Sequence, residues 1–92
     1  MKIFKTVDEK FEMLGFKKTH DDKYTVRYEK EDKEHGFVQV IALCHKASGR
    51  HLLFSYDKDL YDEKGLGNTC VGLTYTETKL ALKKMKQKGW QS

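Results

Sequence analysis

Two cysteines and two histidines are the residues of this chain best suited to bind a metal ion or to act as nucleophile and base. Cys44 is followed directly by His45, and His51 and Cys70 come later in the sequence. Structural zinc sites usually take ligand pairs spaced as C-x2-C or H-x3–5-H. Adjacent residues on a strand point to opposite faces, so Cys44 and His45 cannot bind one ion without distortion. We therefore expect no metal and no cofactor, and we expect both cysteines to serve packing.

Two further segments only superficially match ligand-binding loops. The acidic run DKDLYDEKG starts at Asp57, but an EF-hand needs Gly at position six and Glu at position twelve, where this chain has Asp62 and Asn68. The sequence GLGN at 65–68 lacks the third glycine, the lysine and the following helix of a phosphate-binding loop. We interpret both segments as solvated turns. A chain of 92 residues without an assembled site is a poor enzyme candidate, so we expect no enzymatic activity.

The main functional signal is a run of lysines near the end of the chain. Five lysines stand between positions 79 and 88, and the sequence predicts that they share one solvent-facing side of a helix with a single apolar residue. An exposed apolar side chain ringed by charge can mark a docking site. Lysines near a helix C-terminus are, however, also favoured by the helix dipole without any ligand. The predicted binding face consists of Lys79, Leu80, Lys83, Lys84, Lys86 and Lys88.

The chain as a whole is mildly basic. Eighteen lysines and arginines oppose 14 aspartates and glutamates, which gives a formal net charge of +4. Only Arg27 and Arg50 are arginines, the residue preferred for bidentate contacts to bases and phosphates. There is no long apolar stretch, so we expect neither a secretory signal nor a membrane span. A cytoplasmic protein with reduced cysteines is the expectation, and a Cys44–Cys70 disulfide is the alternative.

Two helices are predicted, over residues 6–14 and 75–88. Each is introduced by a Thr-x-x-Glu capping box and closed by a glycine in the left-handed conformation, followed by an aromatic residue that folds back onto the helix. These end signals are Thr6, Glu9, Gly15 and Phe16 for the first helix, and Thr74, Glu77, Gly89 and Trp90 for the second. Phe16 is expected to contact Phe11, and Trp90 to contact Met85. The predicted buried stripe of the second helix is Tyr75, Thr78, Ala81, Leu82 and Met85.

Three strands are predicted over residues 23–30, 37–45 and 51–56, and the sequence CVGL at 70–73 is a candidate for a short fourth strand. The turns between them are short, which is typical of an antiparallel meander. Two amphipathic helices must bury their apolar stripes against that sheet. We therefore predict one α+β domain over residues 1–92: an antiparallel three- to four-stranded meander flanked by an N-terminal and a C-terminal helix, in the order α-β-β-β-(β)-α.

Short motifs are spread over most of the chain: Leu14-Gly15-Phe16 at the end of the first predicted helix, Tyr24-x-Val26-x-Tyr28 in the first predicted strand, and Gly89-Trp90 at the end of the last helix. Together they resemble a family of small proteins encoded by phages and prophages of Gram-positive bacteria. In that family an "F-x-x-LGY/F" helix end precedes a "Y-x-I-x-Y" strand, and the chain finishes on a helix of the type "T-x-E-E-L…LGW". Thr78 and Lys88 depart from this pattern, since the family tends to have leucine at both positions. The matching residues are Phe11, Leu14, Gly15, Phe16, Tyr24, Val26, Tyr28, Thr74, Glu77, Gly89 and Trp90.

The resemblance carries no established activity, and it implies a small accessory protein of phage type. We expect such a protein to act by binding a host or phage protein in the bacterial cytoplasm, through the lysine face or an exposed part of the sheet. The alternative is a nucleic-acid-associated protein that uses the lysine face. No membrane association is expected.

Overall fold

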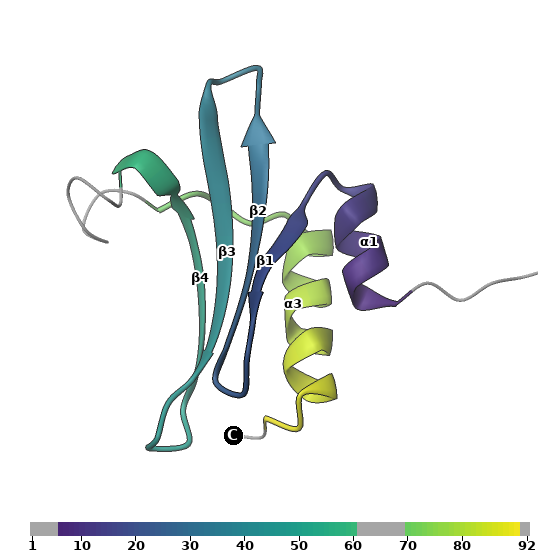
Figure 1. Ribbon diagram of the computed structural model, residues 1–92, viewed down its shortest axis with the longest axis vertical. Helices are drawn as coiled ribbons and strands as arrows, with labels where there is room; N and C mark the ends of the chain where they lie inside the picture. The colour runs from purple at the N-terminus through teal and green to yellow at the C-terminus, as the bar shows by residue number, and fades with distance from the viewer. Residues whose placement is uncertain (1–5, 61–69, 91–92) are drawn as a thin grey trace, which may run out of the picture.

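The described part of the chain forms one antiparallel sheet with two helices on the same face (Figure 1). The computed structural model describes residues 6–60 and 70–90. Sheet order follows chain order, β1-β2-β3-β4, and this confirms the predicted α+β fold with an N-terminal and a C-terminal flanking helix. The elements are α1 (Val7–Met13), β1 (Lys17–Asp21), β2 (Thr25–Asp32), β3 (Phe37–His45), β4 (His51–Asp57) and α3 (Tyr75–Gln87).

The fourth strand precedes the three predicted ones. Strand β1 has the sequence KKTHD, pairs with β2 and contains a bulge between Lys18 and His20. Such a charged, bulged edge strand lacks the alternating apolar pattern by which strands are recognised, yet it protects the sheet edge from pairing with other chains. The candidate strand at 70–73 is wrong, because this segment pairs with β4 through an isolated bridge between Cys70 and Tyr56, beside a hydrogen bond from the Val71 N–H to the Ser55 carbonyl, and does not extend into a regular strand.

The helix-facing side of the sheet carries the main core. Val26 and Tyr28 of β2 are fully buried opposite Leu43 and Ile41 of β3, respectively. This confirms the predicted alternation of β2. Tyr24 precedes the strand and is half exposed, so it lies at the edge of the core.

Helix α1 ends as its sequence predicts. Gly15 has φ +97°, a left-handed conformation that residues with a Cβ rarely adopt. The Phe16 N–H donates to the Phe11 carbonyl at 2.9 Å, the long bond of a Schellman motif. The two rings then meet edge to face with centroids 5.6 Å apart. The turn therefore places Phe16 in the core.

Helix α3 ends in the same way. Gly89 has φ +78°, and the Trp90 N–H donates to the Met85 carbonyl at 3.1 Å. The Trp90 ring is 7% exposed and belongs to the same buried cluster as Met85. Trp90 is therefore a core residue, and the predicted contact between its ring and the Met85 side chain stays a prediction.

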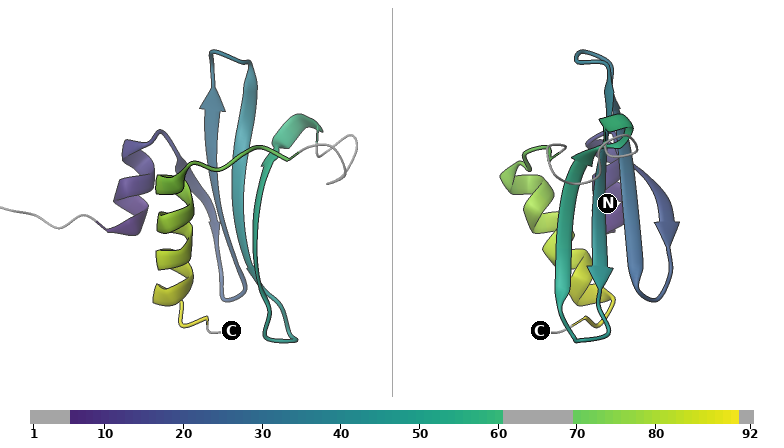
Figure 2. Two further views of the ribbon diagram at one scale, coloured as in Figure 1. Left: turned by 180° about the vertical axis from the view of Figure 1, so that it is seen from behind. Right: turned by 90° about the vertical axis from the view of Figure 1, so that its left-hand side faces the viewer.

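The opposite face of the sheet is not covered by either of the two helices, as the right-hand view of Figure 2 shows. Val40 and Ala42 of β3 and Tyr56 of β4 form a second, smaller buried cluster there, with Phe54 packed against it. The two cores lie on opposite faces, since successive side chains of a strand alternate.

The rotation of α3 differs from the predicted one. Leu80 is 7% exposed and lies in the core, whereas Leu82 is 56% exposed and Tyr75 is 77% exposed. The prediction that Leu80 faces solvent is therefore wrong. Buried Glu77 gives part of the reason: one carboxylate oxygen caps the helix and the other lies 3.8 Å from the ammonium of Lys30 in β2.

Candidate functional site

The predicted lysine face divides into two groups, and one of them is turned towards the rest of the protein. Lys84 Nζ lies 3.1 Å from a carboxylate oxygen of Asp8 in α1. Lys88 Nζ donates to the Asp21 carboxylate and to the Asp22 carbonyl, each at 2.8 Å. These two lysines join α3 to α1 and to the end of β1, so their charges are already matched within the protein.

Asp8 is the centre of this ionic cluster. Burial opposes ionisation of its carboxyl, but hydrogen bonds from Lys18, Tyr28 and Lys84 outweigh that effect and lower its pKa to about 2. Burial, together with the Asp8 carboxylate, raises the pKa of the Tyr28 hydroxyl far above its ordinary value. The hydrogen bond from Lys88 lowers the pKa of Asp21, against a smaller opposing effect of burial. Asp8 and Asp21 are therefore ionised, and Tyr28 is neutral, at neutral pH.

The second group of lysines faces solvent together with two apolar side chains. Lys79, Lys83 and Lys86 are exposed and form no ion pair with any residue in the described ranges. Tyr75 and Leu82 project from the same side of the helix, and the ammonium of Lys79 lies 5.2 Å from the centroid of the Tyr75 ring. We call these five residues the outer face of α3.

A groove continues the outer face towards Lys10 of α1. Helix α1 runs beside α3 in the opposite direction (Figures 1 and 2). The groove has a volume of about 280 Å³, and buried Leu80 contributes to its lining. Three lysines and no acidic residue line it among the residues that the structure describes. The full lining is Lys10, Tyr75, Thr76, Lys79, Leu80 and Lys83. The groove therefore concentrates positive charge beside an exposed aromatic ring.

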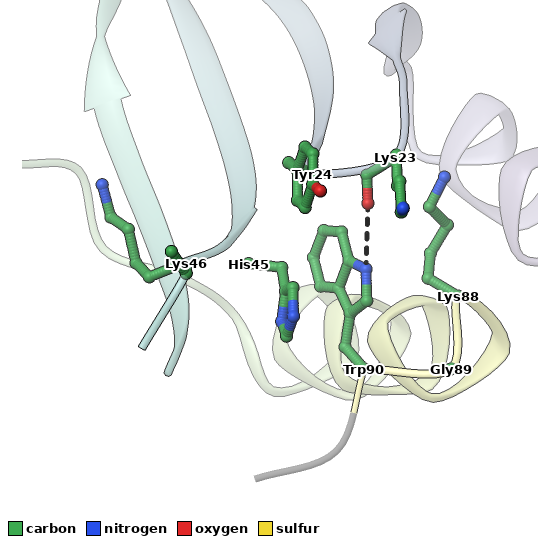
Figure 3. Close-up of a pocket in the computed structure, with 8 residues that line it drawn as sticks. Lys23, Tyr24, His45, Lys46, Lys88, Gly89 and Trp90 are labelled. Carbon is green, nitrogen blue, oxygen red and sulfur yellow. Dashed lines mark hydrogen bonds between the residues drawn. The ribbon is translucent and has the colours of Figure 1, made fainter. Parts of the chain in front are cut away.

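A larger pocket of about 720 Å³ opens at the other end of α3, where the helix terminus meets the turns of the sheet (Figure 3). We call it the Trp90 pocket. Its lining comes from the β1–β2 turn, the end of β3 and the end of α3. The lining residues are Lys23, Tyr24, His45, Lys46, Ala47, Lys88, Gly89 and Trp90.

Three nearly parallel rings form the aromatic part of this pocket. The Tyr24 and His45 rings are 6.3 Å apart at an interplanar angle of 2°, and the His45 and Trp90 rings are 5.6 Å apart at 21°. The Trp90 indole N–H donates to the Lys23 carbonyl at 3.3 Å, drawn as the dashed line in Figure 3. Trp90, which follows α3, is thereby tied to the β1–β2 turn.

Of the residues considered as metal ligands or nucleophiles, His45 and His51 lie side by side, but Cys44 lies on the opposite face of the sheet. Cys44 is a free thiol on the sheet face away from the helices, beside Arg27, so no disulfide joins it to Cys70. His45 lies on the other face, 4.9 Å from the ring of His51. His45 Nδ1 and His51 Nε2 are buried without a hydrogen-bond partner among the residues described. Within residues 6–60 and 70–90, no group of three or more His, Cys, Asp or Glu could hold a metal ion.

Two predictions concern segments that lie wholly or partly outside the described residues: the acidic run after Asp57 and the sequence GLGN at 65–68. In the part of the chain that is described, no helix is long and apolar enough to cross a membrane.

The Trp90 pocket and the exposure of Tyr75 and Leu82 do not follow from the sequence patterns. The pocket joins residues from three separate segments, and its one local signal is an aromatic residue, Tyr24, immediately before β2. Leu80 and Leu82 are both apolar and lie two positions apart on α3, so helical periodicity alone does not predict which of them is buried.

Comparisons with models of protein families, with curated proteins and with solved structures found no match to this chain.

Proposed function

We propose that this protein acts by binding a partner protein through the outer face of α3 and the groove beside it. The observation that carries the proposal is the exposure of Tyr75 and Leu82 on one side of a single helix, among lysines that form no ion pair with the described residues. Protein interfaces commonly combine an apolar or aromatic centre with a polar rim. Tyrosine is enriched among the residues that dominate binding energy, because it offers a large contact area at a small entropic cost.

The positive charge of this surface favours a partner with an acidic binding site. Lys79, Lys83 and Lys86 surround the two apolar side chains, and Lys10 adds a fourth positive charge across the groove. An acidic patch on the partner would complement these charges and accelerate association. The resemblance to phage and prophage proteins makes a host or phage protein in the bacterial cytoplasm the expected partner.

The proposed interface is tested by placing a photo-crosslinking amino acid at position 82. A matched control carries the same amino acid at position 27, where exposed Arg27 lies on the sheet face away from the helices. Both proteins are exposed to lysate of a Gram-positive host after nuclease treatment. We expect one discrete adduct from position 82 and none from position 27. Equal labelling from both positions, or none from position 82, would contradict the proposal.

A charge-reversal variant supplies an independent measurement. Lys83→Glu places an acid between the outer face and the groove without touching the core, because Lys83 is exposed and lines the groove. We expect it to abolish the adduct formed in the background of the crosslinker at position 82, while the circular dichroism spectrum and the free energy of unfolding stay unchanged. The matched control is Lys33→Glu, in the turn between β2 and β3, which should leave the adduct intact.

Nucleic acid is the second candidate, favoured by the three lysines and the lack of acids in the described lining of the groove. Two of the five lysines predicted for this role are already paired with aspartates, which leaves few charges for phosphate contacts. Binding to duplex and single-stranded DNA and RNA should be titrated at several salt concentrations. A steep loss of affinity with salt, reduced by Lys83→Gln, supports this candidate. No binding at low salt removes it.

A further inference from the structure

The Trp90 pocket combines two features that the outer face of α3 lacks: a wall of nearly parallel rings and lysines on both sides of it. We propose that this pocket binds a nucleoside phosphate, meaning an aromatic base joined through a sugar to an anionic phosphate group. Its volume of about 720 Å³ lies within the range of small-molecule sites. The inference is independent of the proposed protein interface, because none of the residues that line the pocket belongs to the outer face of α3 or to the groove beside it.

Tyr24 provides the stacking surface for the base. Its side chain is 52% exposed although its backbone is firmly held. The Tyr24 N–H donates to the Asp22 carboxylate at 2.8 Å, and the Tyr24 carbonyl accepts from the His45 N–H at 2.8 Å. An exposed ring on a fixed backbone loses little freedom when a ligand stacks on it. Aromatic side chains bind nucleobases in this way with little regard to sequence, since every base has a π-face.

The charges of the pocket suit a phosphate group. Lys88 is paired with Asp21, so its charge is matched within the protein. Lys46 forms no ion pair with any described residue, and Lys23 lies with its ammonium 5.5 Å from the centroid of the Tyr24 ring. Figure 3 shows Lys23 and Lys88 on one side of the rings and Lys46 on the other, with the Lys46 side chain extended away from the rings. Lys46 must therefore turn towards the pocket to contact a bound phosphate. No acidic residue is among the described residues that line the pocket.

The pocket offers few groups that could distinguish one base from another. The Trp90 indole N–H is already bonded to the Lys23 carbonyl, and His45 Nδ1 is buried rather than open to the pocket. Recognition therefore rests on stacking and on the phosphate charge. We expect purine and pyrimidine nucleotides to bind with similar affinities, with a modest preference for the larger purines.

Trp90 gives a direct measurement, because it is the only tryptophan in the chain and has a single indole N–H resonance. We expect AMP, titrated into the ¹⁵N-labelled protein at low salt, to shift that resonance in a saturable way. Adenosine lacks the phosphate and inorganic phosphate lacks the base, so each should bind at least roughly fivefold more weakly than AMP. A fivefold change in affinity corresponds to about 1 kcal/mol of binding free energy. No shift with AMP, or inorganic phosphate binding as tightly as AMP, would overturn the proposal.

Two variants and a control locate the ligand. Tyr24→Leu removes the stacking ring and Lys46→Gln removes an unpaired charge, and each should weaken AMP binding by roughly fivefold or more. Lys46 is exposed and outside the core, so this variant is informative even if Tyr24→Leu impairs folding. Lys83→Gln removes one charge from the outer face of α3 and should leave the AMP affinity unchanged. An equal loss with Lys83→Gln would show diffuse lysine binding and contradict the assignment.

The same chemistry occurs in a free nucleotide and at the phosphorylated end of a nucleic acid strand. A 5′-phosphorylated trinucleotide, compared with AMP in the same titration, distinguishes these sources. Tighter binding of the trinucleotide assigns the pocket to a strand end, and equal affinity assigns it to the free nucleotide. Either result upholds recognition of a base and its phosphate. The crosslinking at position 82 can fail without affecting these titrations, so the two proposals are tested separately.

Discussion

Lys84 in the last turn of α3 lies 3.1 Å from a carboxylate oxygen of Asp8 in the first turn of α1. The same carboxylate accepts hydrogen bonds from Lys18 of β1 and from the Tyr28 hydroxyl of β2. One aspartate therefore connects both helices with two strands of the sheet. The sequence predicts Lys84 on the solvent-facing side of its helix, but in the structure it forms part of the contact between α1 and α3.

This ionic cluster predicts how stability depends on pH. The pKa of Asp8 is about 2 in the folded protein and 3.8 in its ordinary state. Because the folded value is the lower one, the ionised carboxylate stabilises the fold above about pH 4, and this contribution is lost as the pH falls from about 4 to about 2. Its size is about 1–2 kcal/mol after allowance for partial solvent screening.

Asp8→Asn tests that contribution. At neutral pH we expect urea denaturation to give a free energy of unfolding lower by about 1–2 kcal/mol than for the unsubstituted protein. At about pH 2 the two proteins should differ little, because Asp8 no longer contributes there. A constant difference between them from neutral pH down to about pH 2 would show that the carboxylate charge is not responsible.

The rotation of α3 is tested by two leucine substitutions two positions apart. Leu80→Ala should lower the free energy of unfolding by about 2–4 kcal/mol, because Leu80 lies in the core. Leu82→Ala should change it by less than about 0.5 kcal/mol, as expected of a surface site. Chemical denaturation followed by circular dichroism measures both. The reverse ranking would mean that α3 presents the opposite side to the sheet.

Trp90→Ala should destabilise the protein by about 2–4 kcal/mol, because its ring is buried and its indole N–H is bonded to the β1–β2 turn. Unfolding of the unsubstituted protein should move the tryptophan fluorescence maximum to longer wavelength as the ring enters water. If Trp90→Ala lowered the free energy of unfolding by less than about 0.5 kcal/mol, as a surface substitution would, the ring could not be buried.

The two glycines that end the helices should respond differently to alanine. Both have positive φ, so each substitution should cost about 1 kcal/mol in backbone strain. A Cβ at position 15 would also lie 3.2 Å from Cδ of Lys30, whereas nothing lies within 4 Å at position 89. We therefore expect Gly15→Ala to be the more destabilising in thermal unfolding. Equal melting temperatures would show that the Lys30 side chain moves aside freely.

Several features of the fold follow from local sequence because their signals lie within one or two turns of chain. The capping boxes at Thr6 and Thr74 form as expected, and so do the glycine-aromatic ends at Gly15 and Gly89. The alternation of β2 is equally local. Strand β1 escapes prediction because its stability comes from pairing with β2 rather than from its own residues.

The sequence by itself therefore determines where the helices begin and end and which strands carry the core. Tertiary structure decides which side of α3 is buried, since Leu80 and Leu82 are equally apolar and only one can face the sheet. The partners of that helix are Lys30, Asp8 and Asp21, and the last of these meets a lysine 67 residues away. Ion pairs over such separations depend on the assembled sheet, so no local pattern could reveal them. The same packing leaves Tyr75 and Leu82 exposed to solvent and brings together the residues that line the Trp90 pocket.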